Sequence, residues 1–304
     1  MSTTAALARG GRAEAWAGRA FVAPALLLIA VFFLFPVLAG FLLSLTDFDL
    51  YGVADPSAVR VVGAANYASL LRSSVFWRAL ANTLVFVLVG GPLTVGAALG
   101  TAVLVSARAT KLRGLFRTLL FAPVVATLVA VAVVWRYLYH PRFGFLNELL
   151  GLVGIEPVNW LGEPRTAMLA IILLAVWKNF GFSMVIFVAA LQAIPEHLYE
   201  AARIDGANAW QQFRRITVPL LGPTFLFVGV TTAIGYFQLF SEPYVLTSGT
   251  GGPLDATLSV VLHMYKEGFR WWNIGYAAAV AFVLFAVILV FTLLQLRLRP
   301  RGER

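Results

Sequence analysis

The sequence predicts an all-α integral membrane protein with six transmembrane helices. Three observations support this fold class: 60% of the 304 residues are hydrophobic, only 12% are charged, and the mean hydropathy is +0.85. An average soluble domain is about 25% charged, so this chain has too few charges to cover a surface that faces water. The composition therefore excludes an ordinary soluble enzyme, a disordered protein and a fibrous repeat.

The apolar residues are grouped into six long runs. A helix that crosses the hydrocarbon core needs about 20 apolar residues, and a membrane β-barrel instead shows alternating segments of about ten. The first run follows three arginines, as in a signal peptide, but it is too long for a signal-peptide core and lacks a small-x-small cleavage site. We therefore predict an uncleaved first span and place the six spans at about 21–45, 82–106, 118–138, 167–193, 220–240 and 274–296.

The charges predict the orientation of these spans. The net charge of +9 would suggest nucleic-acid binding in a soluble protein. Sorted by connection, however, the termini, the second loop and the fourth loop hold 14 basic and five acidic residues, and the other three loops hold seven basic and nine acidic ones. By the positive-inside rule, both termini are cytoplasmic. The positive excess is then a topology signal in a protein that sits in a lipid bilayer, and no nucleic-acid partner is expected.

The chain is predicted to be one membrane domain at 21–298, between cytoplasmic tails at 1–20 and 299–304. It contains no cysteine, and its three histidines are far apart in sequence, so no catalytic residue and no metal site is expected. Prolines at 36, 92 and 123 fall inside predicted spans and are expected to kink them.

The inner loop at 195–219 has more structure than a short basic connection. Pro195 can begin a helix at its first turn, and Glu196 and Glu200 lie near that positively polarised end. Gly206 permits a turn before a second short helix at about 207–213. The pattern predicts a helix–turn–helix on the cytoplasmic face. An interfacial amphipathic helix is the alternative, but such helices usually have a polar face rich in Lys and Arg. We interpret the loop as a docking element for a cytoplasmic protein.

This loop resembles the EAA loop in membrane subunits of bacterial ATP-binding-cassette (ABC) importers. The resemblance rests on Glu200-Ala201-Ala202, Gly206, Ile216 and Val218-Pro219, with Val218 where the family usually has Leu. The longer form from Glu200 to Ala207 is similar to the sugar-importer branch. The resemblance covers roughly residues 20–298, and the last outer loop is similar to that of the maltose-type first permease. The other similar segments are Gly63 with Asn66-Tyr67, Trp135 with Gly144 and Asn147, Trp177-Lys178-Asn179, Leu191 to Pro195, and, in that last outer loop, Thr247 with Gly251-Gly252-Pro253 and Thr257.

The resemblance implies the type I permease fold of ABC importers, in the bacterial cytoplasmic (inner) membrane as a multi-pass protein. It implies a coupling helix that contacts a separate ATPase through Glu200, Ala201, Ala202, Asp205, Gly206 and Ala207. The implied partners are a second permease subunit in a heterodimer, two copies of the ATPase, and an extracytoplasmic sugar-binding protein. The sequence has no GxxxxGK[ST] loop, so we expect no cofactor in this chain and expect ATP and Mg to be bound by the partner ATPase.

Polar side chains within the fourth and fifth spans are the candidates for a substrate site. Polar groups inside a membrane usually face a bundle interior or a cavity, although interhelical hydrogen bonding is an alternative for each Thr or Gln. Aromatic faces and hydrogen-bonding groups together suit a sugar. The maltose-type family builds its site from these parts of the two spans, and the candidates are Lys178, Asn179, Phe182, Thr232, Tyr236, Gln238 and Leu239.

The sequence is compatible with three functions. A carbohydrate permease of an ABC importer is favoured. An ion-coupled secondary transporter is the alternative, but the six spans contain no Asp or Glu that could carry a proton. A scaffold or sensor without transport is disfavoured by the polar faces of the fourth and fifth spans. Lys178 favours an anionic substrate such as a glycerophosphate or a uronide, whereas the run Trp177-Lys178-Asn179 also resembles neutral-sugar permeases, so mono- and oligosaccharides and glycerophosphate-like substrates all stay open at this point.

Overall fold

The computed structural model describes residues 3–106 and 112–297, without the side chains of residues 3–15 and of Pro56. The described residues are helical, with one isolated bridge between Thr46 and Val61 and no strand. The predicted tail at 299–304 lies outside the described residues. The chain divides into two compact units: one holds the residues up to Leu70 and Glu267–Phe282, and the other holds Leu71–Lys266 and the residues from Val283 on.

The all-α fold predicted from composition is confirmed. Four described helices are long and apolar enough to cross a membrane, and two pairs of bent helices raise the number to as many as six. The four are Trp16–Ser44, Ser74–Ser106, α10 (Pro164–Gln192) and α17 (Ile274–Arg297). The bent pairs are Arg113–Val125 with Leu128–Leu138, and Ala209–Leu220 with Gly222–Phe237. Which side of the membrane holds the termini stays a prediction.

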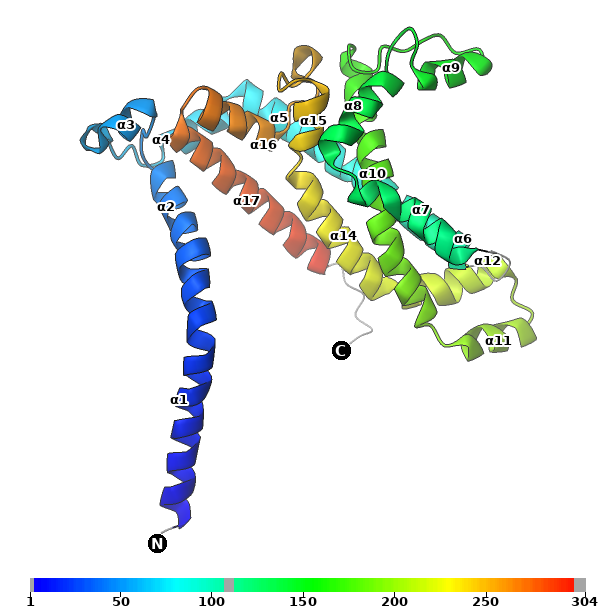
Figure 1. The fold of residues 1–304 in the computed structure, drawn as a ribbon, viewed down its shortest axis with the longest axis horizontal. Helices are drawn as coiled ribbons and strands as arrows, with labels where there is room; N and C mark the ends of the chain where they lie inside the picture. The colour runs from blue at the N-terminus through cyan, green and yellow to red at the C-terminus, as the bar shows by residue number, and fades with distance from the viewer. Residues whose placement is uncertain (1–2, 107–111, 298–304) are drawn as a thin grey trace. The chain divides into compact units, whose positions relative to one another are not determined.

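In the first unit, α1 (Thr3–Ile29) continues through a π-helical segment, Ala30–Leu34, into α2 (Phe35–Ser44) (Figure 1). The short helices α3 (Leu50–Ala54) and α4 (Ala65–Arg72) follow. Asn66 closes the end of α2, because its Nδ2 donates to the carbonyl oxygens of Ser44 at 2.9 Å and Thr46 at 2.8 Å. The backbone carbonyls that a helix end leaves free are thereby satisfied.

The second unit begins with a long helix built from α5 (Ser74–Val85), a π-helical segment, Phe86–Gly90, and α6 (Gly91–Ser106). The third span is α7 (Arg113–Val125) and α8 (Leu128–Leu138), and α9 (Phe145–Leu152) lies in the loop before α10. The inner loop forms α11 (Glu196–Ile204) and then α12 (Ala209–Gln212), which continues through Phe213–Thr217 into α13 (Val218–Leu220). The unit is completed by α14 (Gly222–Phe237), α15 (Ser241–Leu246), α16 (Val260–Tyr265) and the second part of α17.

Prolines inside these helices are accommodated in two ways. Pro36, Pro92 and Pro219 each stand two residues after a five-residue π-helical segment. A proline ring clashes with the carbonyl four residues before it, and in each case that carbonyl lies within the widened π turn. The helix therefore continues past the predicted kinks at Pro36 and Pro92. Pro123 is different: the chain breaks at Ala126 and Thr127, and α7 and α8 meet at 98°. The third span, predicted as one helix, is two.

The core of the second unit lies where α10 packs against α6, α7 and α14. Small residues on α6 let the large side chains of α10 approach closely. Gly181 on α10 faces the backbone of α7, and a Cβ there would come within 3.1 Å of the Phe121 Cα and closer still to the Leu120 carbonyl oxygen. The buried cluster consists of Ala98, Ala102, Phe180, Met184, Phe187, Val188, Leu221 and Val228.

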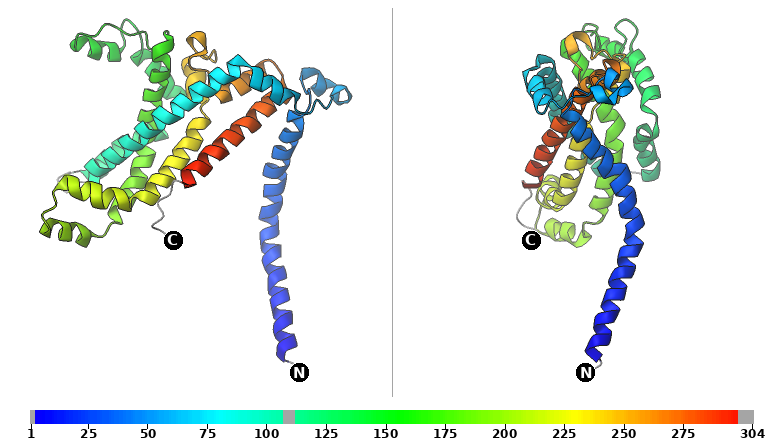
Figure 2. Two further views of the ribbon diagram at one scale, coloured as in Figure 1. Left: turned by 180° about the vertical axis from the view of Figure 1, so that it is seen from behind. Right: turned by 90° about the vertical axis from the view of Figure 1, so that its left-hand side faces the viewer.

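The two ends of the second unit hold different elements. Figures 1 and 2 show α9 and α15 at one end of α10, and α11 and α12 at the opposite end. Asn147 organises the loop around α9, because its amide donates to the Val158 carbonyl at 2.9 Å and accepts from the Trp160 indole at 3.0 Å. A substrate site near α15 and a docking loop at α11 would therefore lie at opposite ends of the same helical unit.

Candidate translocation site

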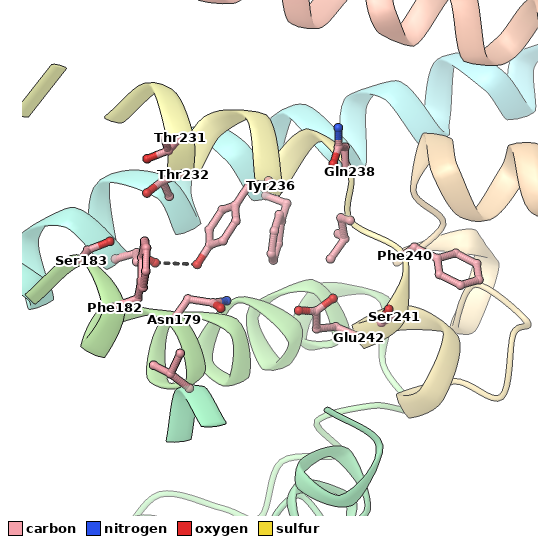
Figure 3. Close-up of a pocket in the computed structure, with 15 residues that line it drawn as sticks. Asn179, Phe182, Ser183, Thr231, Thr232, Tyr236, Gln238, Phe240, Ser241 and Glu242 are labelled. Carbon is pink, nitrogen blue, oxygen red and sulfur yellow. Dashed lines mark hydrogen bonds between the residues drawn. The ribbon is translucent and has the colours of Figure 1, made fainter. Parts of the chain in front are cut away.

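A cavity of about 360 Å³ lies between α10 and α14 in the second unit (Figure 3). α10 contributes Asn179, Phe182 and Ser183, and α14 contributes Thr231, Thr232, Gly235 and Tyr236. The segment after α14 and the first residues of α15 close one side. The full lining is Phe86, Thr94, Val124, Asn179, Phe182, Ser183, Thr231, Thr232, Gly235, Tyr236, Gln238, Leu239, Phe240, Ser241 and Glu242.

Six of the seven substrate candidates from the sequence line this cavity. They are Asn179, Phe182, Thr232, Tyr236, Gln238 and Leu239. They come together because Asn179 and Phe182 share one face of α10, while Thr232 and Tyr236 are four residues apart on the facing side of α14. Helical spacing was the signal that predicted this grouping.

Lys178 is placed elsewhere. It is the fifteenth of the 29 residues of α10, so it stands in the middle of that helix. Its ammonium group turns to the break in the third span and donates to the carbonyl oxygens of Pro123 at 3.3 Å, Val124 at 3.4 Å and Ala126 at 2.9 Å. A broken helix frees carbonyls that lipid cannot satisfy, and the lysine satisfies them. Lys178 is therefore absent from the lining of this cavity, and its place at a substrate site stays a prediction.

The aromatic residues of the cavity have two different environments. Tyr236 is only 7% exposed, its hydroxyl shares a 2.6 Å hydrogen bond with Thr94, and its ring lies 4.5 Å from the Phe86 ring. This tyrosine ties α14 to α6. Phe182 is 54% exposed, so a broad apolar face is available to a ligand. Phe182 is the better candidate for packing against the C–H face of a sugar ring.

Several lining residues were not found from the sequence. Ser183 is four residues after Asn179 and shares its face of α10, so helical spacing could have identified it. Phe86 and Thr94 belong to the second span, and only the tertiary fold brings them to the cavity. Glu242 was counted as an outer-loop charge, whereas it follows α14 so closely that it lines the cavity.

The predicted helix–turn–helix of the inner loop is present. α11 begins after Pro195, and Gly206 ends the turn with a φ of +79°, a conformation that side chains with Cβ rarely adopt. The backbone amide of Ala207 donates to the Ala202 carbonyl at 2.8 Å, which closes the helix end. Asn208 then caps α12 in a reciprocal pair with Gln211.

The outer surface of this loop is open to a partner. Glu200, Ala201, Asp205 and Gly206 are exposed, and Ala202 and Ala207 are half-buried. Ile204 is 87% exposed, which is unusual for an isoleucine outside the membrane. The loop is braced internally, because the Tyr199 hydroxyl on α11 lies 2.8 Å from the hydroxyl of Thr217, in the segment between α12 and α13.

Comparisons with known proteins agree with this architecture. Residues 90–304 match the family described as binding-protein-dependent transport system inner membrane component. The lactose transport system permease protein LacF of Rhizobium radiobacter is 38% identical over 281 residues, which covers 91% of this chain and 92% of LacF. The trehalose/maltose transport system permease protein MalF of Thermococcus litoralis is 34% identical over 287 residues, covering 93% of this chain and 94% of the relative.

A solved structure has the same fold. It is a chain of a bacterial ABC transporter involved in the import of the acidic polysaccharide alginate, with a TM-score of 0.74, 24% sequence identity, and coverage of 96% of this chain and 97% of that chain. The resemblance inferred from the EAA loop is thereby confirmed at the level of family and fold. The chain therefore belongs to the family of inner membrane components of binding-protein-dependent transport systems, as a multi-pass permease subunit.

Proposed function

We propose that this permease imports a carbohydrate through the cavity between α10 and α14. The observation that carries the proposal is the lining itself: an exposed aromatic face at Phe182 stands among hydroxyl and amide side chains of Asn179, Thr232 and Gln238. Sugars present C–H faces and hydroxyl groups, and this lining offers a partner for each. Relatives named for transport of lactose, of arabinooligosaccharides and of trehalose or maltose support the same substrate class.

The energy for import comes, in this proposal, from a separate ATPase that binds ATP and Mg. The coupling residues are Glu200, Ala201, Ala202, Asp205, Gly206 and Ala207, on the exposed side of the α11–α12 turn. This helix pair can transmit a push from a bound partner to α14, because α12 and α13 lead into that helix and the Tyr199 and Thr217 hydroxyls join α11 to the same segment. A second permease subunit completes the pathway, two ATPase copies contact the pair, and an extracytoplasmic binding protein delivers the sugar.

Reconstitution of the whole transporter tests this proposal. The permease pair, the ATPase and the binding protein are placed in proteoliposomes, and uptake of radiolabelled lactose, maltose and arabinobiose is measured. The proposal predicts uptake that requires ATP on the ATPase side and continues when a protonophore removes the proton gradient. Uptake that needs an ion gradient and ignores ATP would instead establish the ion-coupled alternative.

A further inference from the structure

Glu242 is the one residue with a formal charge among those that line the cavity. Figure 3 shows its carboxyl group projecting into the space between α10 and α14, in the direction of Asn179. Within the described part of the chain, the carboxylate has no side-chain hydrogen bond or ion pair at contact distance, and it interacts with its own backbone amide and, more weakly, with the charge of Lys178. The cavity therefore presents an acceptor that the protein does not use.

The positive charge of Lys178 offsets this carboxylate only in part. Lys178 directs its ammonium group to the carbonyl oxygens of Pro123, Val124 and Ala126, at 2.9 to 3.4 Å. Val124 itself lines the cavity, so the lysine is engaged with the backbone of a lining segment. A ligand in the cavity meets the negative side chain directly, whereas Lys178 is not among the residues that line the cavity.

We propose that Glu242 is a specificity-determining residue that selects neutral carbohydrates and excludes those carrying carboxylate groups. The inference rests on the proposed carbohydrate function and names the substrate class of the same cavity. A carboxylate accepts hydrogen bonds from two neighbouring sugar hydroxyls, and charge-assisted bonds are about twice as strong as neutral ones. A uronate in the same place would bring a second negative charge to a site of low dielectric constant, where like charges repel strongly. Selection by repulsion complements selection by contact.

The preference for neutral over acidic sugars can be measured by chemical labelling of a cysteine in the cavity. A delivering binding protein would add its own selectivity, so the permease–ATPase complex is purified without it. Gly235→Cys places a thiol at an exposed cavity position where an added Cβ meets nothing within 4 Å, in a chain that has no other cysteine. The rate of thiol labelling is measured against increasing lactose, maltose, arabinobiose or digalacturonate. Bound sugar slows labelling, and the half-protecting concentration reports affinity.

With Glu242 present, we expect at least one neutral sugar to protect at a concentration about tenfold or more below that of digalacturonate. Glu242→Gln should weaken protection by the neutral sugar, so that the half-protecting concentrations of the neutral sugar and of digalacturonate lie within about twofold of each other. Glu242→Asp, which keeps the charge, should still exclude digalacturonate. Glu148→Gln removes an exposed acid of the outer loop at α9 and should change nothing. ATPase activity of each complex checks that the variant is folded.

Equal protection by digalacturonate with Glu242 present, or unchanged discrimination in Glu242→Gln, would overturn the specificity role and leave the carbohydrate function standing. Labelling at a normal rate that no sugar of either kind slows would remove the carbohydrate site itself.

Discussion

The ammonium nitrogen of Lys178 lies 2.9 Å from the carbonyl oxygen of Ala126, at the point where the third span breaks. The lysine stands in the middle of α10, and the carbonyl belongs to a segment more than fifty residues earlier in the chain. α7 and α8 meet at 98° there, so several carbonyls have no helical partner. One side chain thus holds the bend and joins it to α10.

Replacing this lysine should destabilise the bend. Lys178→Met keeps the length and apolar stem of the side chain but leaves the carbonyl oxygens of Pro123, Val124 and Ala126 without their donor. We expect a loss of roughly 1.5–3 kcal/mol, the usual net contribution of hydrogen bonds made by a charged group. Thermal unfolding of the purified transporter measures it. Lys266→Met is the matched control, because it removes a lysine that donates to an exposed carbonyl, that of Thr250 at 2.8 Å, which lies outside the break in the third span. Equal melting temperatures for the two variants would contradict this account of Lys178.

The hydrogen bond between Thr94 and Tyr236 should behave as one interaction. Thr94→Val and Tyr236→Phe each remove a hydroxyl and keep the shape, and the bond they share joins α6 to α14 at 2.6 Å. Either variant should lower stability by about 1 kcal/mol, and the double variant should lose little more than one of them. Thermal unfolding of the four proteins gives the coupling energy. Strictly additive losses would show that the two hydroxyls act independently.

Glu242→Gln should raise stability at neutral pH. Burial raises the pKa of Glu242 above its ordinary value, and the partial compensation comes from its own backbone amide and from Lys178. The folded chain then holds the carboxyl proton more tightly than the unfolded chain does. Stability from this group is present at low pH and is lost as the pH rises from about 4.5 through the folded-state pKa.

The neutral amide avoids that loss. The variant should melt at a higher temperature than the parent protein at pH 7, and the difference should shrink as the pH falls toward 4.5. The measurement is the melting temperature of the parent protein and of the variant across this pH range. A variant that is less stable than the parent at pH 7 would mean that the carboxylate is held by favourable contacts and is not an unused acceptor. The expected result, a parent protein that is less stable than the variant, would measure the destabilisation caused by a charged carboxylate in the cavity.

Gly206→Val should uncouple ATP hydrolysis from transport. Gly206 has a φ of +79°, and valine resists that conformation by about 1–2 kcal/mol, so the α11–α12 turn should change shape. Gly154→Val is a closely matched control, since Gly154 has a φ of +77°, is exposed in the loop between α9 and α10 and, like Gly206, has nothing within 4 Å of an added Cβ. We expect uptake to fall at least about tenfold only in Gly206→Val. Copurification of the ATPase with each variant shows whether docking itself is lost. Similar uptake by both variants would remove the coupling role from this loop.

Much of this architecture follows from the sequence, for identifiable reasons. Hydropathy locates the long helices because a span must be apolar over its whole length, and Gly206 marks its turn because only a residue without Cβ adopts that conformation easily. The break at Ala126 was not predictable from Pro123 alone, since Pro36 and Pro92 stand in helices that continue. Whether a proline widens a turn or ends a helix depends on partners such as Lys178, which come from elsewhere in the chain.

The sequence predicted residues on the α10 and α14 sides of the cavity, and on α14 the signal was the helical spacing of Thr232 and Tyr236. Phe86 and Thr94 were missed because they approach through tertiary packing. Lys178 was expected to line the cavity and does not, whereas Glu242 was expected in a loop and lines it, for a related reason. Sequence position gives the depth of a charged residue in the membrane, but the direction in which its side chain turns depends on the neighbouring acceptors, and these are known only from the fold.

The central claim is that carbohydrate passes through the cavity between α10 and α14, and chemical blockade of that cavity tests it most directly. Gly235→Cys lines the cavity, and Gly151→Cys is an exposed control in α9. Both are modified to completion with a bulky thiol reagent in the reconstituted transporter, and ATP-driven uptake of the transported sugar is measured. We predict that modification abolishes uptake in Gly235→Cys and leaves it intact in Gly151→Cys. Full uptake after complete modification of Gly235→Cys would contradict the account.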